Sequence, residues 1–244
     1  MRIPRIYTGQ ALSKGTQREL EQGPSAHIAR AMRMRAGDIL TLFNGRGGEY
    51  AATINAVGKK FVAVDIGNHR DTDTESPLAI HLGITISRGD RMDWVIQKAT
   101  ELGAHSITPL LSERTEVKLK GDRAAKKRLH WQQIAIAACE QCGRNRLPEI
   151  NPLQSLPAWL DTATADLKLV LHHRALVTEE AIESPSSIAL LIGPEGGLSE
   201  AEIGLAENAG YQSLGLGPRV MRTETAPLAA MAILQSQWGD MSPG

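Results

Sequence analysis

Short apolar runs alternate with turn residues through the first 70 residues. Residues 39–43, 50–54 and 61–66 fit strands, and glycines separate them. This spacing predicts a tight antiparallel meander. Because strands of this length are not stable alone, we expect a small β-barrel that closes its own edges. A short helix over 27–34 is expected before the first strand.

Polar residues without periodicity follow, and they end at Pro77. Such a stretch is typical of a connection between domains. We therefore expect a first domain over 1–70, a linker over 71–77 and a second domain over 78–244.

The second domain alternates between strands and helices. Residues 78–86 and 106–111 fit buried strands, and between them the apolar residues of 91–102 recur at helical spacing. That pattern predicts a β-α-β unit. Further strands are expected at 167–172, 188–192 and 213–216, with helices between and after them. The alternation predicts an α/β domain with a mostly parallel sheet, covered by helices on both faces.

The composition, with 42 % hydrophobic and 22 % charged residues, is typical of a globular protein. No stretch approaches the roughly 20 apolar residues that a membrane helix needs. No apolar run follows the first five residues, as it would in a signal peptide. We therefore expect a cytoplasmic protein that does not act at a membrane.

Charge is unevenly distributed, although the formal net charge is zero. Residues 1–72 and 112–146 each carry a net charge of +5, whereas 147–244 carry −8. Two basic segments on an otherwise acidic chain are compatible with a nucleic-acid partner, and equally with ordinary solvated faces.

Two cysteines, Cys139 and Cys142, form a CxxC motif. Such a motif can be a redox pair or half of a zinc site, but zinc would need two further ligands and there is no second pair. A redox pair favours the start of a helix, and this motif follows the apolar helical run 134–142. We therefore interpret the thiols as packed in a helix, and we expect no metal site.

A glycine-rich turn follows the apolar strand 188–192 directly. Its sequence is Gly193-Pro194-Glu195-Gly196-Gly197-Leu198-Ser199. Ser199 and Glu202 have the spacing of a capping box, so a helix begins at once. A strand, a glycine turn and a helix at the carboxyl edge of a parallel sheet favour ligand binding, although a plain turn has the same pattern. The turn is neither a dinucleotide fingerprint nor a P-loop.

A second glycine-rich bend covers 214–227. Here a strand leads to an apolar helix over 228–234, with Thr225 as the expected N-cap and Pro227 in the first turn. Arg219, Arg222 and Glu224 would lie at this junction. The arginines could bind an anionic group, or could pair with neighbours and brace the loop.

Together these two motifs closely resemble the signature of the bacterial 16S rRNA (uracil-N3) methyltransferases. That family belongs to the SPOUT class of knotted methyltransferases. Further matches are 87–89, 97–103, 112–114 and 136–144, and Arg2-Ile3-Pro4-Arg5 at the start. The resemblance spans the whole chain.

The resemblance implies a PUA-like RNA-binding β-barrel over 1–70, followed by a SPOUT-type α/β domain that ends in a trefoil knot. It also implies a homodimer that uses S-adenosylmethionine to methylate N3 of a uridine in the 16S rRNA of the small ribosomal subunit. Pattern reasoning alone predicts no knot, because threaded chains are very rare.

Three cofactor loops are implied by the same resemblance. They carry Leu171 and His172; Gly193, Pro194, Glu195, Gly196 and Gly197; and Leu214, Gly215, Leu216, Gly217, Met221, Thr223, Thr225 and Ala226. Glycine loops allow a ligand to approach backbone N–H and C=O groups closely, which suits adenine and ribose.

Methylation at uracil N3 requires that a weakly acidic proton be removed. We hypothesise that Arg222 stabilises the uracil anion, with Glu140 or Glu224 as the proton acceptor or as the group that orients the arginine. Arg88 and Arg114 are candidates for a substrate phosphate or base, or for salt bridges around the loops.

The candidates for RNA backbone contact are basic residues of the two positive segments. They are Arg5, Arg30, Arg33, Arg35, Lys126, Lys127 and Arg128.

Three other functions stay open on these observations. A related knotted enzyme could methylate a ribose 2′-OH or another base. A non-catalytic RNA-binding protein could share the fold. A nucleotide-binding oxidoreductase is disfavoured, because the chain has no dinucleotide fingerprint.

Overall fold

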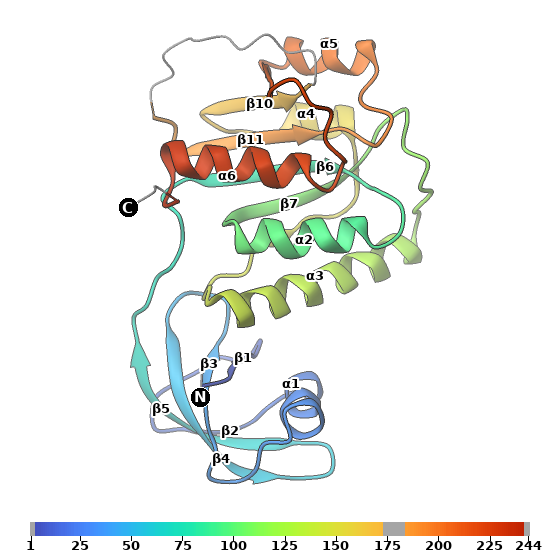
Figure 1. The fold of residues 1–244 in the computed structure, drawn as a ribbon. Helices are drawn as coiled ribbons and strands as arrows, with labels where there is room; N and C mark the ends of the chain where they lie inside the picture. The colour runs from blue at the N-terminus through green and yellow to red at the C-terminus, as the bar shows by residue number, and fades with distance from the viewer. Residues whose placement is uncertain (1–2, 173–183, 242–244) are drawn as a thin grey trace. The chain divides into compact units, whose positions relative to one another are not determined.

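The structure is a computed structural model that describes residues 3–172 and 184–241. These residues form two compact units (Figure 1). The first unit comprises the chain up to Glu75 together with Cys139–Leu147, and the second comprises Ser76–Ala138 and the residues from Pro148 onward. The sequence pattern gave no indication that 139–147 belongs with the N-terminal residues.

The first unit is built on a five-stranded sheet in the order β1-β3-β4-β5-β2. Its strands are β1 (Arg5–Tyr7), β2 (Gln17–Glu19), β3 (Ile39–Phe43), β4 (Glu49–Val57) and β5 (Val62–Arg70). β1 pairs with β3 in parallel, and the other neighbours are antiparallel. The predicted meander is present as β3, β4 and β5, and β1 and β2 lie at the two ends of the order.

The helix expected over 27–34 takes a different form. Helix α1 (Gln22–Ala26) leads into a single π-helical turn, η1 (His27–Ala31), in which Ile28 is buried in the apolar core of the first unit. The chain leaves this turn through Arg33, whose φ of 56° lies in the left-handed region. The prediction was wrong here because a single π turn leaves no periodicity of its own in the sequence.

Two arginines tie 139–147 into the first unit. The Arg5 guanidinium ion-pairs with Glu49, and it donates hydrogen bonds to Asn145 Oδ1 at 2.5 Å and to the Arg144 carbonyl at 3.2 Å. The buried Arg144 in turn pairs with Glu75 at 2.5 Å. Because a buried charge is costly unless it is paired, this network requires all of its members in place.

The second unit contains a seven-stranded sheet in the order β12-β10-β11-β6-β7-β8, with β9 beside β7. The strands are β6 (Ala79–Thr85), β7 (Ala104–Leu111), β8 (Glu149–Ile150), β9 (Gln154–Ser155), β10 (Leu167–Leu171), β11 (Ser187–Ile192) and β12 (Gln212–Leu214). The helices are α2 (Arg91–Glu101), α3 (Asp122–Cys142), α4 (Leu156–Thr162), α5 (Glu200–Asn208) and α6 (Ala226–Trp238), and the last turn of α3, from Cys139 onward, belongs to the first unit. All described strand pairs of this sheet are parallel, so the predicted mostly parallel sheet is confirmed.

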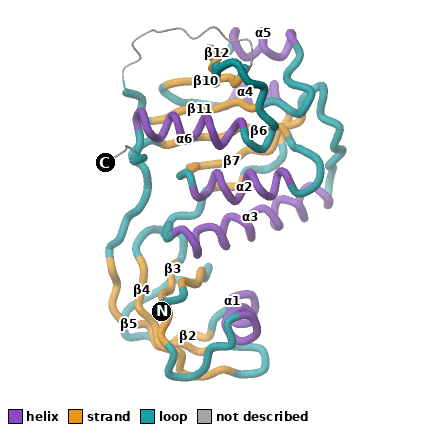
Figure 2. The backbone as a smooth tube through the Cα atoms, in the orientation of Figure 1, coloured by secondary structure: helices purple, strands orange, loops and turns teal. Residues whose placement is uncertain are grey.

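Helices cover both faces of this sheet (Figure 2). Along β11, Ile188, Leu190 and Ile192 join the apolar cluster that includes residues of α2 and α6. The alternate residues Ala189 and Leu191 join a second cluster, with residues of α4 and α5. This alternation follows from the period of two in a strand, and it explains why β11 is apolar throughout.

The CxxC motif lies in the last turn of α3, as the sequence indicated. Cys139 is buried and Cys142 is half-buried, and neither forms a disulfide. The hydrogen bond with Cys142, and then burial, raise the pKa of the Cys139 thiol. A thiol that stays protonated is a poor nucleophile, which supports the interpretation of packed thiols.

A carboxylate joins α2 to α3 in the second unit. Asp93 accepts hydrogen bonds from Lys127 at 2.9 Å, from Trp131 Nε1 at 3.0 Å and from His130 Nε2 at 2.6 Å. Burial alone would raise the pKa of Asp93, but the hydrogen bonds from His130 and Lys127 outweigh it and leave the pKa below its usual value.

Replacing this carboxylate should destabilise the second unit. We expect Asp93→Ala to lower the free energy of unfolding by about 1–3 kcal/mol near neutral pH, since Trp131 is buried and its indole N–H would lose its acceptor. A depressed folded-state pKa contributes stability above the unfolded pKa of about 4 and loses it below. The difference between variant and wild type in urea unfolding should therefore shrink as the pH falls below about 4.

The exposed Asp161 on α4 provides the control. Asp161→Ala should change the unfolding free energy by no more than about 0.5 kcal/mol. Equal losses in the two variants would contradict a special role for Asp93.

Candidate active site

The loops that follow β10, β11 and β12 meet at one edge of the parallel sheet. They enclose a cavity of about 300 Å³ in the second unit. Its lining comprises Arg114, Leu171, His172, residues 192–198, Leu216, Gly217, Arg219, Val220, Met221, Thr223 and Ala226. Most of the predicted cofactor residues therefore line a single cavity, and Leu214, Gly215 and Thr225 are not part of this lining.

The turn after β11 is held by a capping box that the sequence predicted. Ser199 caps the first turn of α5, and the Glu202 carboxylate accepts a hydrogen bond from the Ser199 amide at 2.9 Å. The other carboxylate oxygen of Glu202 accepts from the amide of Glu113 at 2.8 Å. This buried side chain therefore fixes the 112–116 loop against the start of α5, a second role that the capping pattern does not reveal.

Close approach within the turn requires glycine at position 193. A Cβ atom there would lie 2.9 Å from Leu198 Cγ and 3.0 Å from the Leu198 amide nitrogen. Gly197 and Gly217 instead have φ values of 69° and 85°, which other residues adopt at a cost. A Cβ at either of these two positions would meet no protein atom within 4 Å.

Arg114 braces this turn from the neighbouring loop. Its guanidinium donates to the carbonyl of Gly196 at 2.8 Å and to that of Leu198 at 3.4 Å. The bracing role that the sequence left open for Arg114 is therefore present, and the same side chain lines the cavity.

Thr225 occupies the N-cap position of α6, as predicted, with Pro227 in the first turn. Its side chain, however, makes no capping hydrogen bond. The residue has helical backbone angles, φ −85° and ψ −40°, rather than the extended angles that aim an N-cap side chain at the first turn.

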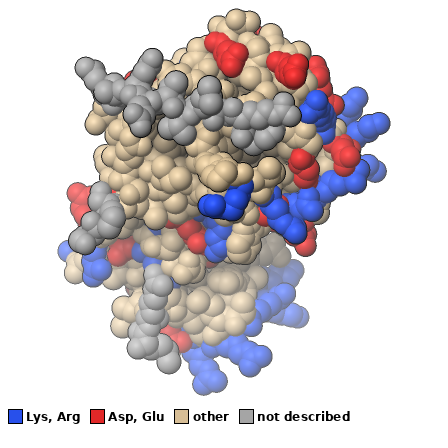
Figure 3. Space-filling view, turned by 45° about the horizontal axis from the view of Figure 1, so that its top comes forward, with Lys and Arg blue, Asp and Glu red and all other residues tan. Residues whose placement is uncertain are grey.

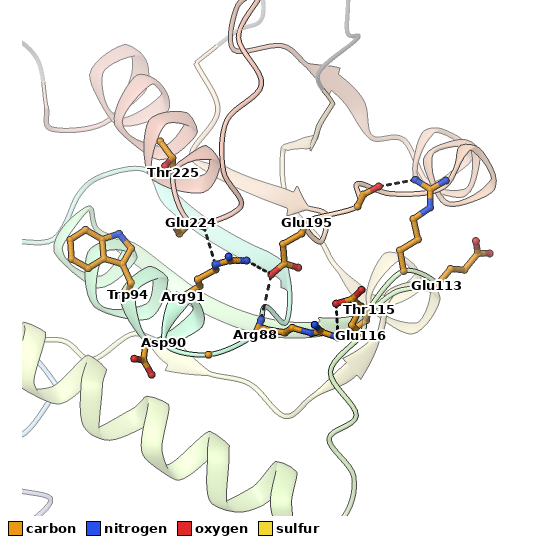
Figure 4. Close-up of a pocket in the computed structure, with 13 residues that line it drawn as sticks. Arg88, Asp90, Arg91, Trp94, Glu113, Thr115, Glu116, Glu195, Glu224 and Thr225 are labelled. Atoms are coloured by element: carbon orange, nitrogen blue, oxygen red, sulfur yellow. Dashed lines mark hydrogen bonds and ion pairs between the residues drawn. The ribbon is translucent and has the colours of Figure 1, made fainter.

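A second, more open cleft of about 1300 Å³ adjoins the cavity (Figure 4). Its walls come from the start of α2, the 113–116 loop, the turn after β11 and the start of α6. The lining residues are Arg88, Gly89, Asp90, Arg91, Trp94, Glu113, Arg114, Thr115, Glu116, Glu195, Gly196, Glu224 and Thr225. Arg114, Glu195 and Gly196 line both spaces, so cavity and cleft share a wall.

Arg91 lies between the two glycine-rich loops. Its guanidinium is 2.9 Å from Glu195 Oε1 in the first loop and 3.8 Å from Glu224 Oε2 in the second (Figure 4). Sequence reasoning missed both Arg91 and Trp94. The available signal was their place at the start of a helix that follows a strand, and for Trp94 a large aromatic residue outside the apolar face of that helix.

The three predicted catalytic residues are in different surroundings. Glu224 lines the cleft, whereas Arg222 is exposed and lines neither space. Glu140 belongs to the first unit, where its carboxylate accepts a hydrogen bond from the Tyr7 amide at 2.9 Å. Burial raises the pKa of Glu140, although this hydrogen bond favours the ionised form.

Most of the predicted RNA-contacting residues are exposed, but some already have partners. Arg30, Arg33, Arg35 and Lys126 are exposed. Arg5 is largely buried and engaged by Glu49 and Asn145, which makes it a poor partner for an RNA backbone. Two further candidates also have partners: Lys127 binds Asp93, and Arg128 donates a hydrogen bond to the Ile150 carbonyl. In Figure 3, many Lys and Arg side chains gather toward one edge of the face in view, interleaved with Asp and Glu.

Metal chemistry has no visible site in the part of the chain that the structure describes. No three His, Cys, Asp or Glu side chains among residues 3–172 and 184–241 are grouped so as to hold a metal ion. Over the same residues, every helix is too short or too polar to cross a membrane.

Two family models match the chain. An RNA methyltransferase domain matches residues 74–235, and an RNA methyltransferase PUA domain matches residues 25–67. The first match covers most of the second unit and also includes 139–147 of the first unit, and the second match lies within the first unit.

Individual relatives agree with these models. A protein of Buchnera aphidicola named ribosomal RNA small subunit methyltransferase E is 39 % identical, with 99 % of each chain covered. A solved Neisseria gonorrhoeae protein of the same name, bound to S-adenosylmethionine, is 41 % identical, with a TM-score of 0.93 and coverage of 99 % of this chain and 100 % of that one. A methyltransferase from Legionella pneumophila in complex with S-adenosylmethionine is 44 % identical, with a TM-score of 0.95 and coverage of 98 % and 100 %.

The chain therefore belongs to the RNA methyltransferase family whose members include the ribosomal RNA small subunit methyltransferases E.

Proposed function

We propose that this family member transfers a methyl group from S-adenosylmethionine to N3 of a uridine in the 16S rRNA of the small ribosomal subunit. The chain is an S-adenosylmethionine-dependent rRNA methyltransferase, as its relatives indicate. The uridine and its N3 atom are our own assignment. The observation that supports it is the wall shared by the glycine-lined cavity and the charged cleft, because a methyl donor in the cavity would lie next to an acceptor in the cleft.

The lining of the cavity of about 300 Å³ suits the chemistry of the cofactor. Gly197 and Gly217 leave space that a side chain would fill, and Leu171, Leu216 and Met221 supply an apolar lining. Backbone groups of the three loops would bind adenine and ribose, and His172 lies at the end of β10. The predicted residues Leu214, Gly215 and Thr225 would support the residues that line the cavity rather than contact the cofactor.

The cofactor supplies an electrophilic methyl group on a sulfonium sulfur. Uracil N3 loses its proton and forms the new bond to the methyl carbon, while the carbon–sulfur bond breaks and a thioether leaves. The protein must stabilise the uracil anion and accept its proton, and most of the remaining work is orientation. Glu224, which lines the cleft, is our proton acceptor. The roles predicted for Arg222 and Glu140 stay predictions.

The resemblance suggests two further properties, which we propose here. One is a trefoil knot at the C-terminal end of the second unit. The other is a homodimer, supported by α6: its residues 226–234 are all apolar, yet Ile233 among them is 50 % exposed. An apolar stretch of helix that one chain leaves partly exposed is typical of a contact with a second chain. Sedimentation as a monomer would contradict the dimer.

We propose that residues 1–70 act as an RNA-binding module joined by the linker 71–77 to the catalytic domain over 78–244. Arg30, Arg33 and Arg35 form its exposed basic surface around the π turn. Lys126 and Arg128, with Lys127, would add contacts from α3, and Arg88 and Arg114 from the cleft. Because the proposed substrate is the ribosomal subunit, the enzyme would act in the cytoplasm.

The decisive test is methyl transfer to unmodified small ribosomal subunits. We expect label from S-adenosylmethionine to enter 16S rRNA, and digestion to nucleosides to yield N3-methyluridine. Label in a ribose-methylated nucleoside would identify the related knotted activity instead. No transfer at all would favour a non-catalytic RNA-binding protein.

Cofactor binding should depend on the close approach at Gly193. We expect Gly193→Ala to weaken S-adenosylmethionine binding by roughly 5- to 150-fold in calorimetry, because relief of the clash with Leu198 costs about 1–3 kcal/mol and displaces the turn. Gly204 on α5 is the matched control, since a Cβ there meets nothing within 4 Å. Gly204→Ala should leave the affinity unchanged. Equal affinities in both variants would show that this turn is not part of the cofactor site.

RNA binding should depend on the arginines around the π turn. The left-handed backbone at Arg33 is a conformation that glycine adopts freely, so Arg33→Gly removes charge without backbone strain. We expect Arg30→Ala with Arg33→Gly to weaken binding to the small subunit at least tenfold, and to reduce the slope of log affinity against log salt by about two. Affinity for S-adenosylmethionine should not change. An equal loss of both affinities would reject the assignment.

A further inference from the structure

The cleft of about 1300 Å³ combines an exposed aromatic ring with charged groups at the shared wall. It is larger than the roughly 300–1,000 Å³ of typical small-ligand pockets. Such a space can admit a nucleotide together with neighbouring backbone. The mechanism above uses only Glu224 from this cleft, and it assigns no role to Trp94 or Arg91.

Trp94 is the aromatic residue of the cleft. Trp94 is 50 % exposed, unlike the buried Trp131 and Trp159 of the same unit. The Lys98 ammonium lies 5.2 Å from its ring centroid, a contact that favours one orientation of the indole. An exposed indole on the wall of a charged cleft suits a base that has left its stack, because every base offers a π face.

Arg91 lies one helical turn before Trp94 and therefore on the same face of α2. Figure 4 shows Trp94 and Arg91 on this helix, with Arg91 directed between Glu195 and Glu224. The 3.8 Å separation between Arg91 Nε and Glu224 Oε2 is longer than a hydrogen bond. A ligand can therefore bind between Arg91 and Glu224 while Arg91 keeps its 2.9 Å contact with Glu195.

This pair matches the edge of uracil that carries N3. That edge presents one N–H donor between two carbonyl acceptors, whereas Glu224 presents an acceptor beside the donors of Arg91. A carboxylate that accepts the N3 proton and a cation near a carbonyl oxygen both favour the anion that reacts. Cytosine presents no N–H at N3, so the pair also discriminates against that base.

The rim of the cleft can bind phosphate at little cost. Arg88 pairs with Glu116 at 2.8 Å, but their side chains are 67 % and 63 % exposed. Such exposed pairs typically contribute no more than about 1 kcal/mol. An RNA phosphate can therefore replace Glu116 as the partner of Arg88.

We propose that this cleft is the binding site of the flipped target uridine, with Trp94 stacked on the base and Arg91 beside the uracil oxygens. The inference rests on the proposed function and assigns its substrate site. Arg91 then has two tasks, because it also holds Glu195 of the cofactor turn. Arg91 therefore links the binding site of the base to the wall of the cofactor cavity.

A crosslinking experiment tests the stacking. Small subunits are reconstituted with 5-iodouridine at the position methylated by the wild-type enzyme, because irradiation joins this base to an aromatic ring stacked on it. We expect the crosslinked peptide to contain Trp94. Trp94→Leu should lose the crosslink, whereas Trp238→Phe on α6 should keep it. A crosslink to another residue, with none at Trp94, would overturn the proposal.

Kinetics and calorimetry test the roles separately. Trp94→Ala should slow methyl transfer by roughly 5- to 150-fold, the range expected for loss of one base–aromatic stack, while Trp94→Phe stays within a few-fold. Cofactor affinity should stay within twofold of wild type in both. Leu205→Ala on α5, also an exposed apolar residue, is the control for surface truncation. Unchanged transfer by Trp94→Ala, or a parallel loss of cofactor affinity, would contradict the assignment.

The pH dependence of the rate tests Arg91. A nearby cation lowers the pKa of bound uracil, so Arg91→Gln should shift the rising limb of the rate profile to higher pH, and Arg91→Lys should restore much of it. A uniform loss at all pH values would indicate a structural role only and would overturn this part. If the wild type methylates no uridine, the proposed function fails by itself, and crosslinking at random uridines still decides whether the cleft binds a base.

Discussion

The active site depends on one constraint, the parallel alignment of β10, β11 and β12. Parallel strands end at the same edge, so the loops that follow them must meet there whatever their sequence separation. Residues near 171, 193 and 216 can therefore line one cavity although other elements separate them along the chain. The strand β11 stabilises this arrangement, because alternate residues along it are buried on opposite faces of the sheet, each against a different set of helices.

Local patterns predicted the elements that carry their own signal. The strand at 39–43, the helix beginning at Arg91 and the capping box of Ser199 and Glu202 are all present as expected. The loops of the cavity were predicted through a family resemblance rather than through geometry. The π turn at His27–Ala31 was missed because one irregular turn has no period. The short strands β8 and β9 have two residues each, too few for any alternation to be detected.

What the sequence could not reveal are pairings between side chains that lie far apart along the chain. Arg91 and Glu224 are separated by more than half of the protein, and only the folded sheet brings them together. For Arg5, the sequence could not reveal that the side chain already has partners. Its basic side chain suggested RNA binding, but it is engaged by Glu49 and Asn145, so the charge serves the first unit internally. Charge counts predict that a polyanion is a plausible partner without identifying the arginines that are available to it.

The arginines of this protein differ in how much their existing partners constrain them. The side chains of Arg5 and Arg144 are only 11 % and 6 % exposed, and removing a partner would leave an uncompensated charge at a cost of several kcal/mol, so their ion pairs are permanent. Arg88 and Arg91 are 67 % and 44 % exposed at their side chains, so water and salt weaken their ion pairs. Arg88 can therefore exchange Glu116 for an RNA phosphate, and Arg91 can exchange its contact with Glu224 for a uracil oxygen while it keeps Glu195. The exposure of an ion pair, more than its distance, therefore separates the cations that hold the fold from those that can bind substrate.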